Sequence, residues 1–181
     1  MLFRSFNNTD PEEVEKRKTL LNDIFGTEVN AWIEPPFYFC YGTHIKLQDH
    51  VYINMNCTMI DDGSITIGKN VMIGSNVSII TTGHPVDLEL RLKGYMYTAP
   101  VVIKDNCWIG TQTTICPGVT IGENSVIGAG SVVTKDIPSN VVAVGNPCRV
   151  LRAIGEKDKQ NYFHDRKISE CLSEDGELIN R

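Results

Sequence analysis

The chain contains four histidines, and His84 has the position best suited to chemistry. It stands at the start of a segment, residues 81–100, that interrupts a regular repeat. An imidazole titrates near neutral pH and can act as a general base. Counting the repeats places Asp62 on the same edge of the fold, where a carboxylate would hold the tautomer of the ring and raise its basicity. The alternative is that Asp62 is only a corner residue and His84 only a loop residue.

The cysteines do not indicate a metal site or a redox site. No two of them form a Cys-x-x-Cys pair, and most lie inside apolar repeats, where a free cysteine packs as a small hydrophobe. We therefore expect reduced thiols and a cytoplasmic protein. The six cysteines are Cys40, Cys57, Cys107, Cys116, Cys148 and Cys171.

Length and charge narrow the class of protein. The 181 residues suit a single domain, residues 1–181. A net charge of −5 argues against nucleic acid as the main partner. No apolar run approaches the roughly 18 residues of a membrane span, and the N-terminus lacks the layout of a signal peptide. We expect neither a membrane partner nor a secreted protein.

A repeat of six residues must position His84. From Val101 to Asp136 a bulky aliphatic residue recurs every six positions, preceded two positions earlier by a small or β-branched residue. This period fits neither a helix nor a lone strand, but it fits a short strand and a tight turn wound around a prism. Three strands complete a coil of about 18 residues, and Gly or Asn takes the corners. The sequence predicts a mostly β, parallel β-helix.

The remaining segments suggest how the solenoid is organised. Asp10–Glu13 offers a helix N-cap with proline at the first helical position, and Gly26 ends that helix. We expect a helical cap over about residues 1–26, a β-helix over 40–150 with an external loop at 82–100, and a C-terminal tail at 151–181 that lies over the solenoid or frays. Association through the flat faces would form a trimer and place each loop against a neighbour.

Four pieces of sequence resemble the maltose/galactoside O-acetyltransferase family, and the similarity runs from about Pro11 to Lys167. The family has a left-handed parallel β-helix, and the resemblance implies direct transfer of an acetyl group from acetyl-CoA within a ternary complex, without a metal. The pieces are Thr82-Gly-His84-Pro85, Asn54-Met-Asn56 with Asp61-Asp62, Cys107-Trp108-Ile109-Gly110 and Gly145-Asn-Pro147-Cys148-Arg149.

The resemblance also implies a role for individual residues. His84 takes the proton of the acceptor hydroxyl, and the backbone N–H of Thr111 is a candidate donor to the thioester carbonyl. The acceptor positions are Asn54, Asp62, Cys40, Tyr95, Met96 and Trp108, of which Trp108 lines the transfer channel. The CoA positions are Thr111, Ala129, Thr134, Lys135, Arg149 and Arg152. Lys135, Arg149 and Arg152 would pair with the phosphates of CoA. The alternative is that these three side chains only form part of a solvent-exposed face.

Departures from the family leave the acceptor open. The chain starts after an N-terminal helical segment that supplies an acid to the sugar pocket in relatives, a serine appears as Cys40, and a loop acid appears as Tyr95. Maltose, a galactoside, an antibiotic or a serine hydroxyl remain candidate acceptors, and a non-catalytic trimeric CoA-binding scaffold is a further alternative. A hexapeptide-repeat carbonic anhydrase would need three stacked histidines, which His44, His50 and His84 do not provide.

Overall fold

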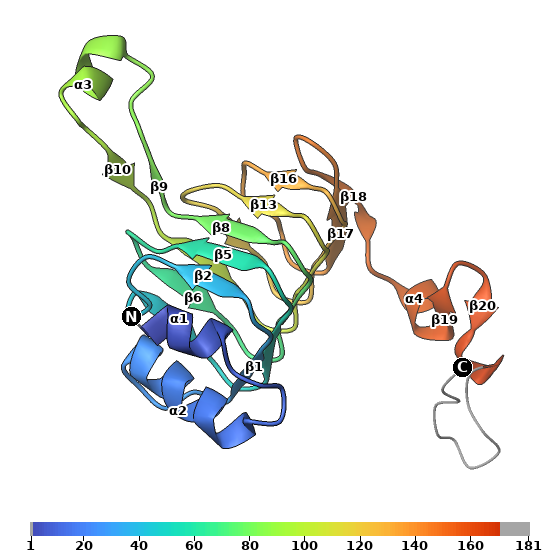
Figure 1. The fold of residues 1–181 in the computed structure, drawn as a ribbon. Helices are drawn as coiled ribbons and strands as arrows, with labels where there is room; N and C mark the ends of the chain where they lie inside the picture. The colour runs from blue at the N-terminus through green and yellow to red at the C-terminus, as the bar shows by residue number, and fades with distance from the viewer. Residues whose placement is uncertain (1, 171–181) are drawn as a thin grey trace.

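The protein is a three-sided solenoid with helices over one end (Figure 1). The computed structural model describes residues 2–170. Sheet A consists of β1 (Ala31–Ile33), β4 (Val51–Ile53), β7 (Met72–Ile73), β12 (Trp108–Ile109), β15 (Val126–Ile127), β17 (Val141–Val144) and β18 (Arg149–Ala153). Sheet B consists of β2 (Phe37–Phe39), β5 (Cys57–Ile60), β8 (Ser78–Ile80), β13 (Thr114–Ile115) and β16 (Val132–Val133). Sheet C consists of β3 (Ile45–Leu47), β6 (Ile65–Ile67), β11 (Val101–Ile103) and β14 (Thr120–Ile121).

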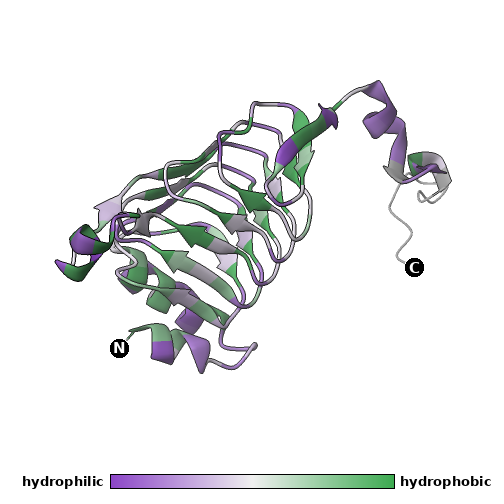
Figure 2. Ribbon diagram, turned by 90° about the horizontal axis from the view of Figure 1, so that it is seen from above, coloured by the Kyte–Doolittle hydropathy of each residue, from purple (hydrophilic) through white to green (hydrophobic). Residues whose placement is uncertain are grey.

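Successive coils are in register, so the aliphatic residue of each repeat stacks on that of the next coil. Ile73 pairs with Ile53 below it and with Ile109 above it, and the three side chains are at most 1% exposed. Strand pairing in the three sheets is parallel until β18 returns antiparallel along β17. The predicted parallel β-helix is confirmed, and Figure 2 shows its hydrophobic strands.

The corners of the prism have the residue types that the repeat predicted. Asparagine adopts positive φ at several of them, and Gly118 and Gly130 do the same with φ of 82° and 71°. An L-residue pays a steric cost in this region, which glycine avoids and asparagine tolerates. The asparagines are Asn56, Asn70, Asn76, Asn106, Asn124 and Asn140.

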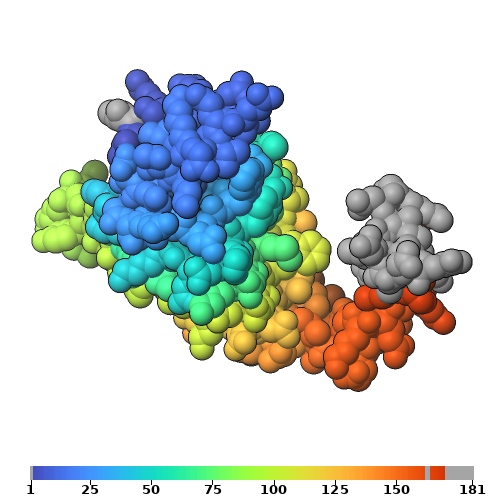
Figure 3. Space-filling model, turned by 90° about the horizontal axis from the view of Figure 1, so that it is seen from below, coloured from blue at the N-terminus to red at the C-terminus, as the bar shows by residue number. Residues whose placement is uncertain are grey.

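Two helices, α1 (Leu2–Asn7) and α2 (Val14–Phe25), cover the first coil (Figure 3). The side chain of Asn7 exchanges two hydrogen bonds with the backbone of Phe37, at 2.8 and 3.0 Å, and so pairs the open edge of β2. Gly26 ends α2 in the left-handed conformation, as predicted. The predicted N-cap at Asp10 is wrong, because α2 begins only at Val14 with Glu13 before it. The expected contact of the acid is present, since the Asp10 N–H donates to the Glu13 carboxylate at 2.9 Å, but it closes a turn that precedes the helix.

The solenoid begins two strands earlier than predicted. The sequence predicted a start near residue 40, whereas β1 and β2 already form two sides of a coil. Pro35 and Pro36 occupy the corner between these strands, and the spacing of six residues from Ile33 to Phe39 is the same as that from Ile53 to Met59 on the next coil. Ile33 and Phe37 point inward, at 3% and 0% exposure, because the second coil supplies the pairing partners.

Two arms leave the solenoid (Figure 1). The predicted external loop consists of β9 (Thr82–Gly83), α3 (Leu88–Leu92) and β10 (Tyr97–Thr98). The C-terminal arm consists of α4 (Glu156–Gln160), β19 (Asn161–Phe163), β20 (Arg166–Lys167) and the 3-10 turn Ile168–Glu170. It projects away from the coils of its own chain and does not lie over them. Within residues 2–170, no helix combines the length and apolarity needed to cross a membrane.

Candidate active site

His84 lies at the base of the external loop, just after β9. Its side chain is exposed, and its Nδ1 atom lies 3.0 Å from the backbone carbonyl oxygen of Tyr95. A carbonyl oxygen only accepts hydrogen bonds, so Nδ1 carries the proton in this contact. The neutral ring then keeps a lone pair on Nε2 that can take up a proton. The loop therefore holds the imidazole in an orientation that a general base would need.

The partner of His84 differs from the predicted one. A carboxylate was the expected partner, with Asp62 as candidate, yet the hydrogen bond of the ring goes to a backbone carbonyl. The neighbouring Asp61 is fully buried and accepts N–H bonds of 2.8 to 3.0 Å from Cys40, Tyr41 and Gly42. Asp61 thus shapes the turn that carries Cys40, and its carboxylate is used there.

Thr81 joins the loop to the coil below it. Its buried hydroxyl donates to the carbonyl of Ile60 at 2.7 Å and accepts the N–H of Gly63 at 2.8 Å. Its carbonyl accepts the N–H of Ala99, where the loop returns. These bonds confirm that the Asp61–Gly63 corner and the loop share an edge, one coil apart. A loop whose two ends are held by hydrogen bonds in this way can orient the imidazole that it carries.

The predicted site residues lie on two different edges of the prism. The loop edge follows the strands of sheet B, and together with its arm it carries Cys40, Asp62, His84, Tyr95, Met96, Thr134 and Lys135. The glycine edge follows the strands of sheet A and carries Asn54, Thr111 and Ala129. Trp108 lies beside the glycine edge on sheet A itself. Sheet B separates the two edges, so a single chain does not bring the two sets together.

The glycine edge is named for Gly74, Gly110 and Gly128, which stack on successive coils. A Cβ atom at Gly74 would lie 2.7 Å from the nitrogen of Thr111, and one at Gly110 would lie 2.6 Å from the nitrogen of Ala129. Only glycine permits this approach. Neither nitrogen has a hydrogen-bond partner among the residues that the structure describes. The edge therefore offers two backbone donors beside a narrow, small-residue surface.

Sheet A carries an outward row of large side chains, of which only Trp108 was predicted from the sequence. Trp32, Tyr52, Met72 and Trp108 are in register on four successive coils. Trp32, Met72 and Trp108 are 45%, 52% and 52% exposed. Each residue directly precedes the inward isoleucine of its strand, where the strands of sheets B and C carry Thr, Ser or Val from the second coil on. That departure is the signal in the sequence that would have found the row.

The three predicted phosphate-binding cations do not form one cluster in the chain. Lys135 lies on the loop edge, whereas Arg149 and Arg152 lie on β18 at the end of sheet A. The guanidinium of Arg152 makes two bonds, of 2.7 and 2.8 Å, to the carboxylate of Asp158. These bonds lower the pKa of Asp158 to about 2 and raise that of Arg152. Arg149 donates from one nitrogen to the Cys148 carbonyl at 2.7 Å.

The cysteines within the described part of the chain are free thiols, and Cys171 lies outside it. Cys40 is exposed, and the pKa of its thiol is raised by partial burial and by the nearby charges of Asp62 and Asp61. Burial raises the pKa of Cys57 to about 11. Between residues 2 and 170 there is no group of three or more His, Cys, Asp or Glu side chains arranged to hold a metal ion.

Two family models match the solenoid. The model described as bacterial transferase hexapeptide (six repeats) matches residues 100–135, and the model described as hexapeptide repeat of succinyl-transferase matches residues 64–89. The second match includes the start of the external loop, with His84.

Relatives match nearly the whole chain. The chain is 55% identical over 172 residues to the galactoside O-acetyltransferase of Escherichia coli (strain K12), and this match covers 94% of this chain and 85% of the relative. The structure of a galactoside acetyltransferase in complex with coenzyme A has a TM-score of 0.86 at 54% identity, covering 92% of this chain and 84% of that one. A maltose O-acetyltransferase from Clostridium difficile 630 has a TM-score of 0.83 at 49% identity, covering 86% and 83%.

Proposed function

We infer the function from the premise that the chain belongs to the galactoside/maltose O-acetyltransferase family of left-handed, hexapeptide-repeat acyltransferases. The protein is an acetyl-CoA-dependent O-acetyltransferase, and its acceptor is a hydroxyl of a sugar-like molecule. The observation that carries this proposal is the contact between His84 Nδ1 and the Tyr95 carbonyl, because it presents Nε2 as a base.

The reaction that we propose needs no covalent intermediate with the enzyme. His84 takes the proton of the acceptor hydroxyl while the hydroxyl oxygen attacks the carbonyl carbon of the thioester. An ester bond forms, the carbon–sulfur bond breaks, and the proton passes to the departing thiolate of CoA. The N–H of Thr111 would donate to the thioester carbonyl oxygen as negative charge develops on that oxygen. This role is supported by the fact that the N–H has no hydrogen-bond partner among the described residues.

We propose a homotrimer in which the loop edge of one subunit faces the glycine edge of the next. Such an assembly would bring together the two halves of the site that one chain keeps apart. The external loop supports this arrangement, since Val86, Leu88 and Leu92 are 93%, 60% and 79% exposed in the single chain. Apolar side chains gathered on a projecting arm are typical of a surface that another chain covers.

Acetyl-CoA would lie along the groove between those two edges. The small residues of the glycine edge leave room for pantetheine, and the N–H groups of Thr111 and Ala129 are available to it. Thr134 and Lys135 are exposed on the facing loop edge. Arg149 would bind phosphate with the guanidinium nitrogens that its bond to the Cys148 carbonyl does not use.

Arg152 fits the phosphate role less directly than Arg149. Its guanidinium already binds Asp158, so a phosphate would have to replace or share that carboxylate. The pair is exposed, and exchange of one anion for another there would cost little. We keep Arg152 as a proposed CoA residue on this ground.

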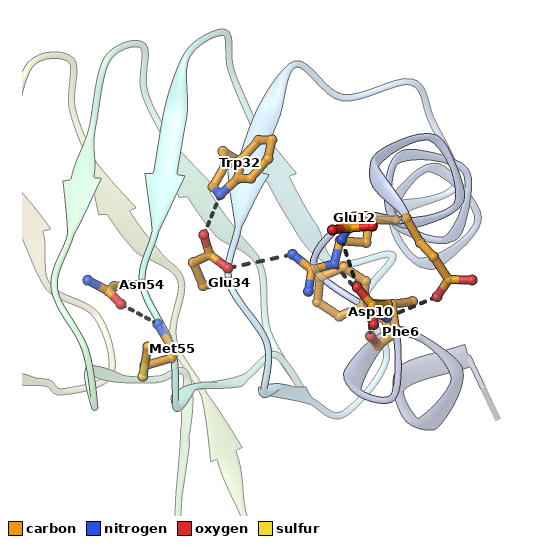
Figure 4. A network of polar contacts seen from close by, with 10 residues as sticks. Phe6, Asp10, Glu12, Trp32, Glu34, Asn54 and Met55 are labelled. Carbon is orange, nitrogen blue, oxygen red and sulfur yellow. Dashed lines mark hydrogen bonds and ion pairs between the residues drawn. The ribbon is translucent and has the colours of Figure 1, made fainter.

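The acceptor would bind nearer the N-terminal coils. Asn54 accepts the N–H of Met55 with its Oδ1 at 2.7 Å (Figure 4), and its amide NH₂, which makes no hydrogen bond to the described residues, would be available to a ligand. Trp108 would line the transfer channel from sheet A. Across the groove we propose the following acceptor contacts from the neighbouring loop edge: Asp62, Cys40, Tyr95 and Met96.

We propose that the protein works in the cytoplasm. The free thiols at Cys40, Cys57, Cys107, Cys116 and Cys148 support a reducing compartment.

The test is release of CoA thiol from acetyl-CoA across a panel of sugars, nucleosides and antibiotics. Release with a sugar, lowered about 100- to 10,000-fold in His84→Ala with acetyl-CoA binding unchanged, would support the proposal. His50→Asn is the matched control, because His50 lies on the third edge with φ of 61°, a conformation that asparagine tolerates. Release with an antibiotic alone would change the acceptor class. CoA binding without turnover of any acceptor would favour a non-catalytic scaffold.

A further inference from the structure

The outward row on sheet A continues below the proposed acceptor site. Trp32 on β1 is in register with Tyr52 on β4. The N–H of Glu34 donates to the carbonyl of Ile53 at 2.8 Å, which places Glu34 on the glycine edge one coil below Asn54. Coils are spaced about 4.8 Å apart, so Trp32 lies roughly 14 Å along the row from Trp108. That span exceeds one pyranose ring and suits two.

A buried arginine holds Glu34 in place. Glu34 accepts the indole N–H of Trp32 at 2.7 Å, and its other carboxylate oxygen lies 3.6 Å from the guanidinium of Arg17 (Figure 4). Arg17 also donates to the hydroxyl of Thr9 at 2.9 Å. The side chain of Arg17 is 8% exposed, whereas that of Glu34 is 31% exposed. The carboxylate is therefore anchored from inside and open to a ligand from outside.

The exposed ring and the carboxylate have complementary chemistry. An aromatic ring offers a flat apolar surface, and a carboxylate has about four sites that accept hydrogen bonds. Trp32 and Arg17 together use two of the sites on Glu34. A hollow beside Trp32 extends the surface toward α2, and its lining combines apolar side chains (Val14, Leu21, Val29, Ala31 and Ile33) with Arg17, Lys18 and Asn30. A sugar ring, with an apolar face and outward hydroxyls, matches both groups.

We propose that Trp32 and Glu34 form a second acceptor subsite, which binds the sugar ring beyond the one that is acetylated. This inference rests on the proposed function and deepens it, because it names a disaccharide as the acceptor class. The reacting ring lies near Asn54 and His84 of the neighbouring subunit. The distal ring stacks on Trp32 and donates hydroxyl hydrogen bonds to Glu34.

If Trp32 and Glu34 had only a structural role, their substitution would have a different effect on activity. Arg17 and Glu34 join α2 to the first coil, so a role limited to stability would affect all acceptors alike. A subsite affects only acceptors that reach it. The comparison therefore needs two acceptors that differ by one ring, such as maltose and glucose, and measurements of stability on the same variants.

The test compares Glu34→Gln and Trp32→Ala with the wild-type protein. Glutamine keeps the size of Glu34 and an oxygen that accepts the indole N–H, but it removes the charge. We expect kcat/KM for maltose to fall about 10- to 100-fold, as for the loss of a charged hydrogen bond. We expect kcat/KM for glucose and the KM for acetyl-CoA to stay within about twofold of wild type. Glu28→Gln, an exposed carboxylate 3.7 Å from Lys18, is the matched control with no expected effect.

The outcomes separate the two proposals. Equal losses with maltose and glucose, or a loss that follows a fall in Tm, would make the network structural and overturn the subsite. A wild-type protein that uses glucose as well as maltose, and binds both equally, would also overturn it while leaving the acetyltransferase intact. A wild-type protein that acetylates no sugar would remove the proposed acceptor class, and the subsite with it.

Discussion

At the scale of single residues, backbone groups provide hydrogen-bond partners that side chains were expected to provide. The carbonyl of Tyr95 orients His84, and three N–H groups satisfy the buried carboxylate of Asp61. Both arrangements depend on loops whose ends are held by hydrogen bonds, so the imidazole of His84 and the carboxylate of Asp61 stay in place without an oppositely charged partner. The backbone N–H of Thr111, which has no hydrogen-bond partner among residues 2–170, would act in the same way in the proposed transfer step.

Arg149 provides a prediction at this scale. Arg149→Ala should raise the KM for acetyl-CoA about 10- to 100-fold, because it removes a charged hydrogen bond to a phosphate. The KM for acetyl-pantetheine, which lacks the nucleotide, should change much less. Steady-state kinetics with both donors measure the difference. Equal increases for the two donors would remove Arg149 from the phosphate site.

At the scale of elements, each strand is too short to be stable alone and depends on its neighbours in the stack. The inward isoleucines fill the prism, and the glycines of the glycine edge let successive corners approach. The N-terminal helices and the side chain of Asn7 close the first coil, since an open edge strand would pair with another chain. The external loop is the segment that carries the proposed base, and it lies outside this stack.

Ile109 tests the packing of the stack. It is fully buried between Ile73 and Ile127. Ile109→Ala should lower the free energy of unfolding by about 2 to 5 kcal/mol, and Ile109→Val by about 0.5 to 1.5 kcal/mol. Denaturant titration at a fixed protein concentration measures both, because subunit association would otherwise shift the result. A loss below 1 kcal/mol for alanine would contradict a close-packed core at this coil.

Asp158 tests how the C-terminal arm is held. Its pKa of about 2 lies below the ordinary 3.8, so the pair with Arg152 stabilises the arm above about pH 4, and this contribution is lost as the pH falls toward 2. Asp158→Asn should reproduce the loss at neutral pH and speed hydrogen exchange of residues 154–163. Glu156→Gln, which breaks only the exposed pair with Lys159, is the control. Unchanged exchange in Asp158→Asn would mean that other contacts hold the arm.

At the scale of the whole molecule, the proposed site residues lie on two edges that a single chain does not bring together. The loop edge carries the proposed base, His84, the glycine edge carries the proposed donors to CoA, and sheet B keeps the two edges apart. A three-fold arrangement would make three equal sites from three chains. Activity would then depend on assembly, and dilution that separates the subunits would abolish it.

Subunit mixing tests this arrangement. His84→Ala and Asn54→Ala damage opposite edges, so a mixed trimer would contain one site in which both edges are intact. Random reassociation of equal amounts should restore about a quarter of wild-type activity at subsaturating acceptor. Thiol release before and after denaturation and renaturation of the mixture measures it. No recovery, with mixed trimers present, would mean that both residues act within one chain.

The sequence by itself determined the solenoid, the external loop and the presence of His84 at its start, because the six-residue repeat is a local pattern that recurs in every coil. It also predicted the positive-φ corners, since those depend on residue type. Only the tertiary structure decided where the first coil begins, because Ile33 and Phe37 are buried by strands about 20 residues further along the chain. The partner of His84, the pairing of Arg152 with Asp158 and the separation of the two edges likewise depend on how distant segments meet in space, and the spacing of residues along a chain does not specify those contacts.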